Sequence, residues 1–143
     1  MDERDELIAT ILQRVAGIGR ELTAARAHPL GDLRLSRSQL DALFLLSHAE
    51  IPVTAGSLAT TLGVTPGAVT QLVAGLREHG LVETTIDDDD ARVRVIRLTP
   101  STRARVDAFE RAAVDRLSPS FAALDTHDLR QLCELLRKRE ERP

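Results

Sequence analysis

The stretch TAGSLATTLGVTPGAVTQLVAGLREHG, from Thr54 to Gly80, decides the fold that we predict for this chain. Leu58 and Leu62 are four residues apart, and a second apolar stripe follows at Val69, Leu72, Val73 and Leu76. Spacings of three and four residues place such side chains on one face of a helix. The stretch therefore predicts two short helices joined by a tight turn.

The residues of the turn and of the expected helix crossing are specific. Gly63 is expected to take the left-handed conformation that ends the first helix. Thr65 can cap the second helix with its hydroxyl, and Pro66 then occupies the first helical position, where a missing N–H has no cost. Ala59 is small where the two helices would cross, and Val69 can fill the angle between them. This spacing is that of a helix-turn-helix.

The second predicted helix carries short or polar side chains opposite its apolar stripe. Threonine and glutamine can reach base edges or phosphates, and small residues allow close approach to DNA. A plain surface helix of a bundle would also carry such a face, but the turn and crossing residues favour DNA binding. Ala74 shares this face, and the candidate DNA-binding residues are Thr65, Pro66, Gly67, Ala68, Thr70, Gln71 and Arg77.

A β-hairpin is predicted directly after the second helix. Gly80 ends the helix, and residues 81–86 and 92–98 are rich in Val, Ile and Thr around an acidic turn. A hairpin in this position is the wing of a winged helix, whose tip approaches the DNA minor groove. Arg92 and Arg94 are candidate DNA-binding residues of the wing, because a narrow minor groove attracts arginine. Asp90 is placed to hold the guanidinium of Arg92.

A long N-terminal helix is predicted from Asp5 to about Ala27. Its apolar stripe is broad and consists of Leu7, Ile8, Ile11, Leu12, Val15, Ile18 and Leu22. A terminal helix with such a face must pack on a large surface, and a second subunit is the natural candidate. Packing within the chain alone is the alternative.

A further helix and a short strand are predicted between the N-terminal helix and the central stretch. Ser36 begins this helix with a capping box to Gln39. The segment from Ile51 to Val53 is predicted as a small strand. The buried face of the helix is expected to consist of Leu40, Leu43, Phe44 and Leu46.

Two helices are predicted after the hairpin. Thr99 and Pro100 repeat the pairing of a cap with proline at the first position, so a long helix should run to about Leu117. Ser118 and Pro119 interrupt it, and Asp125 or Thr126 caps a last helix. These two helices and the N-terminal one are expected to form a second, all-helical region.

Length and composition exclude several classes of protein. The chain has 143 residues, a net charge of −3 and no apolar run near the roughly 20 residues of a membrane span. Its acidic start is unlike a signal peptide, so we expect a cytoplasmic protein without a membrane partner.

The single Cys133 excludes an internal disulfide and a multi-cysteine metal site. Its place on an apolar stripe predicts core packing rather than redox sensing.

The chain contains no pattern that indicates catalysis, a cofactor or a metal. A glycine-rich phosphate loop, a nucleophile elbow and an HExxH motif are all missing, so we predict that the protein is not an enzyme. The run from Asp87 to Asp90 is reminiscent of a calcium loop. Arg92 stands where that loop needs glycine and Leu98 where it needs a bidentate glutamate, so a solvated turn is the better interpretation.

The ordered set of these motifs resembles the MarR family of bacterial transcriptional regulators. The resemblance lies in Gly80-Leu81-Val82 directly after the second helix, the Asp90-x-Arg92 pair and the closing Leu98-Thr99. It covers nearly the whole chain. It implies a mainly α fold with a small β-hairpin wing, of class α+β. In that fold a winged helix-turn-helix (residues 36–100) is flanked by an N-terminal dimerisation helix (1–35) and C-terminal dimerisation helices (101–143).

The resemblance also implies partners and roles. A homodimer would bind a pseudo-palindromic operator in double-stranded DNA, and a small lipophilic or aromatic effector would release it. Thr65 to Arg77 would enter the major groove, Arg92 would enter the minor groove, and Asp90 would orient the wing. Repression is the predicted outcome, although an activator would have the same sequence features.

The wing departs from the family pattern in its charge. Glu83, Thr84 and Thr85 stand where the family often has a basic pair, and Ala91 replaces an arginine. Arginines and acids are equal in number from Thr65 to Arg105. Repulsion between the aspartate run and DNA phosphates predicts modest affinity with a steep salt dependence. The alternative is a winged-helix protein-interaction module with weak or no DNA binding.

Overall fold

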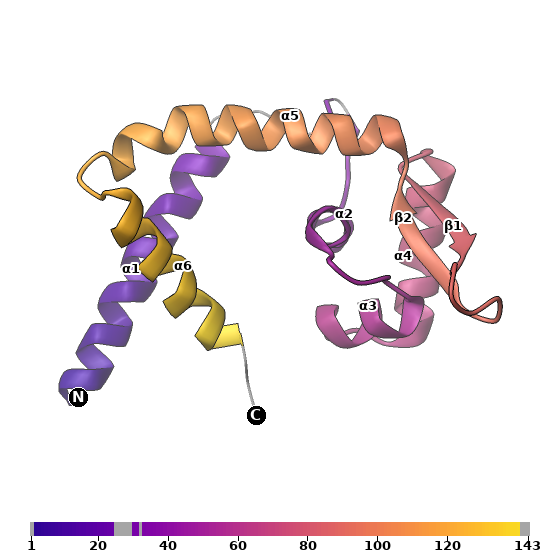
Figure 1. The fold of residues 1–143 in the computed structure, drawn as a ribbon, viewed down its shortest axis with the longest axis horizontal. Coiled ribbons are helices and arrows are strands. Elements are labelled where there is room, and N and C mark those ends of the chain that lie inside the picture. The colour runs from indigo at the N-terminus through magenta and orange to yellow at the C-terminus, as the bar shows by residue number, and fades with distance from the viewer. Residues whose placement is uncertain (1, 25–29, 32, 141–143) are drawn as a thin grey trace. The chain divides into compact units, whose positions relative to one another are not determined.

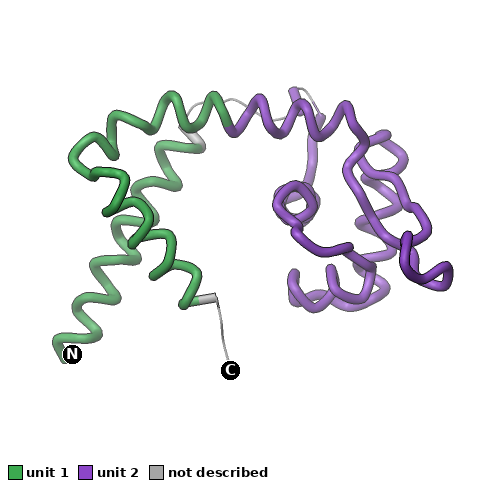
Figure 2. The backbone as a smooth tube through the Cα atoms, in the orientation of Figure 1, with its two compact units in different colours: residues 1–26, 111–143 green, residues 27–110 purple. Residues whose placement is uncertain are grey.

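The computed structural model describes residues 2–24, 30–31 and 33–140, which form two compact units. Residues 27–110 make one unit, and residues 1–26 with 111–143 make the other (Figure 2). The elements in chain order are α1 (Glu3–Ala24), α2 (Arg37–His48), α3 (Ala55–Leu62), α4 (Pro66–Glu78), β1 (Val82–Ile86), β2 (Arg94–Leu98), α5 (Pro100–Leu117), the 3₁₀ helix η1 (Ser118–Phe121) and α6 (Thr126–Glu140) (Figure 1). The predicted mainly α fold with a small β-hairpin is confirmed. No helix in the described part of the chain is long and apolar enough to cross a membrane.

The turn between α3 and α4 has the predicted geometry. Gly63 has φ 65° and ψ 35°, the left-handed conformation. The N–H of Val64 donates to the carbonyl of Ala59 at 3.1 Å, which closes the end of α3. Thr65 lies in an extended conformation, and its hydroxyl oxygen accepts the N–H of Ala68 at 3.2 Å. Local capping therefore sets both ends of the turn, as the sequence predicts.

The hydrophobic core of the unit formed by residues 27–110 lies between α2, α3, α4 and the hairpin. Ala59 and Val69 are buried at the α3–α4 crossing, as predicted. The predicted capping box of α2 is also present, since Ser36 and Gln39 exchange side-chain and main-chain hydrogen bonds. Leu43 and Leu46 on α2 are buried, whereas Leu40 and Phe44 are partly buried. The largest apolar side chains below 2% exposure in this core are Leu30, Leu43, Leu58, Val69, Leu76, Val82 and Val106.

The hairpin is a two-stranded antiparallel sheet with one additional bridge. Its register pairs Val82 with Leu98 at one end and Ile86 with Arg94 at the other. The predicted strand at Ile51 to Val53 is reduced to a single bridge, in which the N–H of Ile96 donates to the carbonyl of Val53 at 2.8 Å. Helix α3 begins at Ala55, two residues after Val53, so the pairing cannot continue in that direction.

Thr99 joins the end of α4 to the beginning of α5. Its main-chain N–H donates to the carbonyl of Leu81 at 3.1 Å, and its hydroxyl donates to the carbonyl of Gly80 at 3.0 Å. The same oxygen lies 3.4 Å from the N–H of Thr102 and 2.8 Å from its hydroxyl, so Thr99 also caps α5. This arrangement satisfies the hydroxyl of the buried Thr102.

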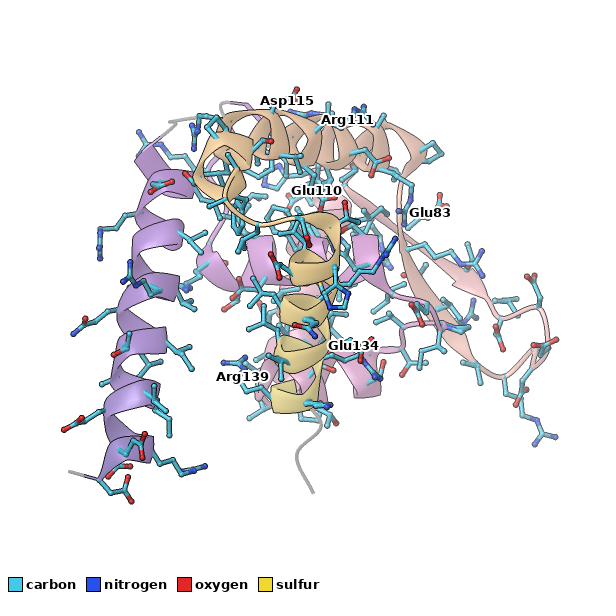
Figure 3. The ribbon with its side chains drawn as sticks, turned by 60° about the vertical axis from the view of Figure 1, so that its left-hand side comes forward. Glu83, Glu110, Arg111, Asp115, Glu134 and Arg139 are labelled. Atoms are coloured by element: carbon cyan, nitrogen blue, oxygen red, sulfur yellow. The ribbon has the colours of Figure 1, made fainter. Side chains whose placement is uncertain are left out.

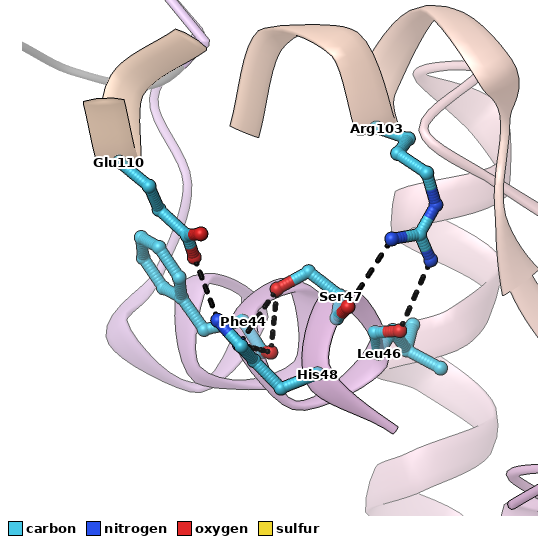
Figure 4. Close-up of polar contacts among 6 residues, drawn as sticks. All are labelled: Phe44, Leu46, Ser47, His48, Arg103 and Glu110. Carbon is cyan, nitrogen blue, oxygen red and sulfur yellow. Dashed lines mark hydrogen bonds and ion pairs between the residues drawn. The ribbon is translucent and has the colours of Figure 1, made fainter. Parts of the chain in front are cut away.

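Polar contacts from Arg103 and Glu110 hold the C-terminal end of α2 against α5 (Figure 4). The Arg103 guanidinium donates to the carbonyl of Ser47 at 3.1 Å. About two turns further along α5, the carboxylate of Glu110 lies 3.0 Å from the Nε2 of His48. Arginine at a helix C-terminus satisfies free carbonyls and is favoured by the helix dipole. The contacts therefore fix α2 relative to the first half of α5.

The second unit consists of α1, the end of α5, η1 and α6. The Arg116 guanidinium donates to the carbonyls of Glu21 and Leu22, the latter at 3.2 Å, and so caps the last turn of α1. Helix α1 confirms the predicted N-terminal helix up to Ala24, and the remaining predicted residues up to Ala27 lie outside the described residues. Asp125 caps α6 by accepting the N–H of Asp128 at 2.9 Å.

Apolar faces of this second unit are exposed in the single chain. Leu12 on α1 is 61% exposed and Leu135 on α6 is 63% exposed. Cys133, predicted to pack in a core, is exposed as well. The prediction was wrong because the α6 face that carries Cys133 is not covered within one chain. The other large apolar residues of α1 and α6 that are exposed are Leu7, Ile8, Ile11, Val15, Leu22, Leu129, Leu132 and Leu136.

Replacing Gly63 with alanine tests the turn. The added Cβ would meet no atom within 4 Å, so the change acts only through the left-handed backbone. That conformation costs an alanine about 1–2 kcal/mol. We expect Gly63→Ala to lower the free energy of unfolding in urea by about this amount. The control is Gly67→Ala on α4, where the space is also open and φ is not positive. It should leave stability unchanged or raise it by up to about 1 kcal/mol.

Candidate nucleic-acid interface

The outward face of α4 is the first part of the candidate interface. The candidate residues predicted on this helix and its cap are all exposed: Thr65, Pro66, Gly67, Ala68, Thr70, Gln71 and Arg77. The opposite face is fixed in the core by Val69 and Leu76, both 0% exposed. The face is therefore held rigidly by its packing and remains open for contact with a partner.

The wing supplies the second part of the candidate interface. Strand β1 contacts α4, and both belong to the unit formed by residues 27–110 (Figure 1). Arg92 in the turn and Arg94 at the beginning of β2 are exposed. The fold thus brings the candidate residues of α4 and those of the wing into one unit.

Asp90 holds the main chain of Arg92. Its Oδ1 accepts the Arg92 N–H at 2.9 Å, which makes an Asx turn. The sequence predicted a contact with the guanidinium, and the contact that the structure contains goes to the main chain instead. The turn places the N–H of Arg92 over the carboxylate and leaves its side chain exposed. Asp90 therefore stabilises the main-chain conformation of the turn that contains Arg92.

Main-chain hydrogen bonds close the acidic turn. The N–H of Val93 donates to the carbonyl of Asp90, and the N–H of Asp87 donates to the carbonyl of Val93, both at 3.0 Å. Asp88 and Asp89 are exposed between these bonds. Among the described residues, no group of three or more His, Cys, Asp or Glu side chains has the geometry to hold a metal ion. The exposed aspartates therefore concentrate negative charge in this turn.

Charges also face each other along the strands of the wing. The register places Glu83 opposite Arg97, and both side chains are exposed. Directly opposed charges of opposite sign attract each other across an antiparallel pair. The register therefore sets a carboxylate across the sheet from Arg97, although the described side chains of the two residues form no ion pair. Glu83 is labelled on the hairpin in Figure 3, which also labels charged residues of α5 and α6.

No pattern in the sequence indicates a role for Arg103. This residue holds the C-terminal end of α2, and its partner Ser47 is 56 residues away in the chain. No local pattern predicts a cap supplied from such a distance, because capping motifs are recognised only from neighbouring residues. The position of Arg103 on α5 becomes informative only after the fold is known.

The model of the MarR family matches residues 35–93, which include α2, α3, α4, β1 and the turn of the wing. No curated protein matches the chain. The family match covers the segment that contains the caps at Ser36 and Thr65, the left-handed Gly63 and the turn of the wing.

Solved structures with the same fold span almost the whole chain. A MarR family protein from Bacillus stearothermophilus is 21% identical, with 99% of this chain and 96% of that chain covered and a TM-score of 0.68. MepR, a transcription regulator of the Staphylococcus aureus multidrug efflux pump MepA, is 22% identical, with 90% and 93% covered and a TM-score of 0.58. MepR bound to ethidium bromide is 21% identical, with 91% of both chains covered and a TM-score of 0.61.

Replacing Asp90 with alanine tests its role in the turn. A net hydrogen bond contributes about 1 kcal/mol, so we expect the Arg92 amide to exchange with solvent roughly five-fold faster in Asp90→Ala. Amide hydrogen exchange measured by NMR checks this. Asp88→Ala removes the same charge without removing the contact and should leave the rate unchanged. Equal rates in the two variants would contradict the Asx turn.

Proposed function

Since the chain carries a winged helix-turn-helix of the MarR family, we propose that it is a DNA-binding transcription regulator. The observation that carries this proposal is the outward face of α4, which is exposed, polar and free of bulky apolar side chains. A helix with this face fits the major groove, and its small residues let the backbone approach base edges. The structural likeness to MepR supports the same conclusion.

We propose that the regulator is a homodimer. Leucine, isoleucine and valine side chains form the exposed apolar faces of α1 and α6, where a soluble chain would otherwise present a large patch to water. A second copy covers such faces by two-fold symmetry, in which each chain offers the same surface. Two reading units related in this way bind a pseudo-palindrome with half-sites about one helical turn apart.

We propose that a small lipophilic or aromatic effector releases the regulator from DNA and that the DNA-bound form represses transcription. MepR, which has the same fold, has been solved with the aromatic cation ethidium. A groove of about 330 Å³ in the unit formed by residues 27–110 has room for such a molecule, with Ile51, Pro52 and Val53 among its lining residues. An effector that favours one spacing of the reading units shifts the population away from the DNA-competent form.

The wing is proposed to contact the minor groove through Arg92, with Arg94 at the adjacent backbone. Asp90 supports this role by holding the main chain at Arg92. The aspartate run opposes it, because its charges repel phosphates. The balance predicts modest affinity that depends strongly on salt. The rival proposal, a protein-interaction module with weak or no DNA binding, is favoured by the same exposed aspartates.

Arg92→Ala separates the two proposals. Loss of one phosphate-proximal charge should weaken DNA binding at every sequence and lower the slope of log affinity against log salt by about one per arginine removed. Fluorescence anisotropy with labelled operator DNA at several salt concentrations measures both quantities. Arg111→Ala on α5 removes the same charge outside the interface and is the matched control.

The two outcomes of that measurement have distinct meanings. A weaker complex in Arg92→Ala, with an intact dimer and an unchanged Arg111→Ala control, supports the DNA reader. Identical binding by wild type and both variants, at the level of non-specific affinity, favours the protein-interaction module.

Leu12→Asp tests the dimer. Leu12 is exposed in the single chain, so a charge at this position should not destabilise an isolated chain. In a dimer the same charge would be buried between the two copies with no opposite charge beside it, which is strongly unfavourable. We expect Leu12→Asp to sediment as a monomer and to lose most of its DNA affinity. Gln13→Asp adds the same charge on the polar side of α1 and should remain dimeric. A wild-type protein that sediments as a monomer would overturn the dimer.

A further inference from the structure

The hydroxyl groups of the helix-turn-helix are already engaged within the helices. Thr60 and Thr61 on α3 donate to the carbonyls of Gly56 and Ser57 at 3.2 and 3.0 Å. On α4, the Thr70 hydroxyl donates to the carbonyl of Pro66 at 3.0 Å. Each of these threonines has thus used its single donor, and only its acceptor lone pairs remain available to DNA.

Gln71 differs from these residues because its side-chain amide makes no hydrogen bond within the described part of the chain. It is exposed, and its nearest neighbours on the helix surface lack long side chains. Those neighbours, at spacings of three and four residues, are Gly67, Ala68, Ala74 and Gly75. The amide therefore projects from the outward face of α4 with no long α4 side chain three or four residues away.

The cationic side chain of α4 lies elsewhere on the helix. Arg77 is six residues after Gln71, which corresponds to about 9 Å along the axis. It stands one residue before the end of α4. Base edges are contacted mainly by the beginning of a recognition helix, so Arg77 is placed to meet the phosphate backbone. Thr65, at the beginning, already accepts the N–H of Ala68 as a cap.

We infer that Gln71 is the residue of α4 that determines base specificity and that it reads adenine in each half-site. This inference rests on the proposed DNA-binding function. An amide presents one donor and one acceptor in one plane, which matches N7 and N6–H of adenine in the major groove. Guanine presents two acceptors there, cytosine one donor, and thymine one acceptor with a methyl group. Only adenine satisfies both ends of the amide.

Selection of bound sequences from a random double-stranded DNA pool, repeated for wild type and Gln71→Ala, tests the inference. We expect the wild type to select a palindrome with one invariant A·T pair per half-site that loses its preference in Gln71→Ala. In anisotropy measurements, changing that pair in one half-site should weaken wild-type binding on the order of 10- to 100-fold. Gln71→Ala should bind operators that carry any of the four base pairs at that position with affinities within about a factor of two, because the bidentate contact is missing.

Two further variants test the base assignment and provide a control. Gln71→Glu keeps the size of the side chain but only accepts, so its selected pair should change from adenine to cytosine. Gln131→Ala is the matched control, because it removes an exposed glutamine from α6 and should retain the wild-type sequence preference. Both substitutions of Gln71 are at an exposed helical position, where glutamine, alanine and glutamate all have high helix propensity.

The outcomes distinguish the inference from the proposed function. Sequence-selective binding by the wild type, with an unchanged preference at every position in Gln71→Ala, would overturn the inference and leave the regulator intact. A preference lost at a G·C pair would overturn the assignment to adenine. If the wild type selects no sequence at low salt, both the inference about Gln71 and the proposed DNA-binding function are overturned.

Discussion

The left-handed turn at Gly63 is the constraint on which the candidate interface depends. It ends α3 and turns the chain at once into α4, so that Val69 enters the core at the crossing of the two helices. Once Val69 and Leu76 are buried, the rotation of α4 about its axis is set, because residues three and four apart share a face. Gln71 and its small neighbours must then lie on the outside. A change at the turn is therefore expected to affect both stability and the presentation of the reading face.

The wing shows how opposing electrostatic effects can coexist in one turn. The carboxylate of Asp90 is needed as an acceptor for the Arg92 N–H, yet its charge lies in a run of four aspartates that repel phosphates. Arg97 is opposed by Glu83 across the sheet. Acidic residues outnumber arginines in the wing. In the proposed regulator we expect sequence discrimination to come from α4, because base-edge contacts specify sequence whereas charge supplies sequence-independent affinity.

The two units differ in how their stability arises. The unit formed by residues 27–110 has a continuous buried core drawn from α2, α3, α4, the hairpin and the beginning of α5. In the unit formed by residues 1–26 and 111–143, large apolar side chains of α1 and α6 remain exposed in the single chain. Burial of apolar surface is the main favourable term in folding, so this unit is expected to gain its stability from association. Arg116 orders the end of α1, but such polar contacts do not replace a core.

The sequence by itself determined the features that act over a few residues. The caps at Ser36, Thr65 and Thr99, the left-handed Gly63 and the breaks at Gly80 and Pro119 could all be predicted, because a cap or a turn joins residues three or four apart. The apolar periodicity likewise predicted the helices and the outward face of α4. These features place the candidate residues of α4 and the wing, and the resemblance to the MarR family follows from their order.

Only the tertiary structure decided the contacts between residues that are distant in the chain and the burial that depends on them. The cap of α2 by Arg103 and the exposure of Cys133 could not be read from the sequence. The same holds for the single bridge at Val53. Asp90 was assigned to the wrong group of Arg92, because the sequence shows the two residues but not the path of the turn between them. Local hydrogen bonds depend on which residues are neighbours, whereas long-range packing depends on how whole elements meet.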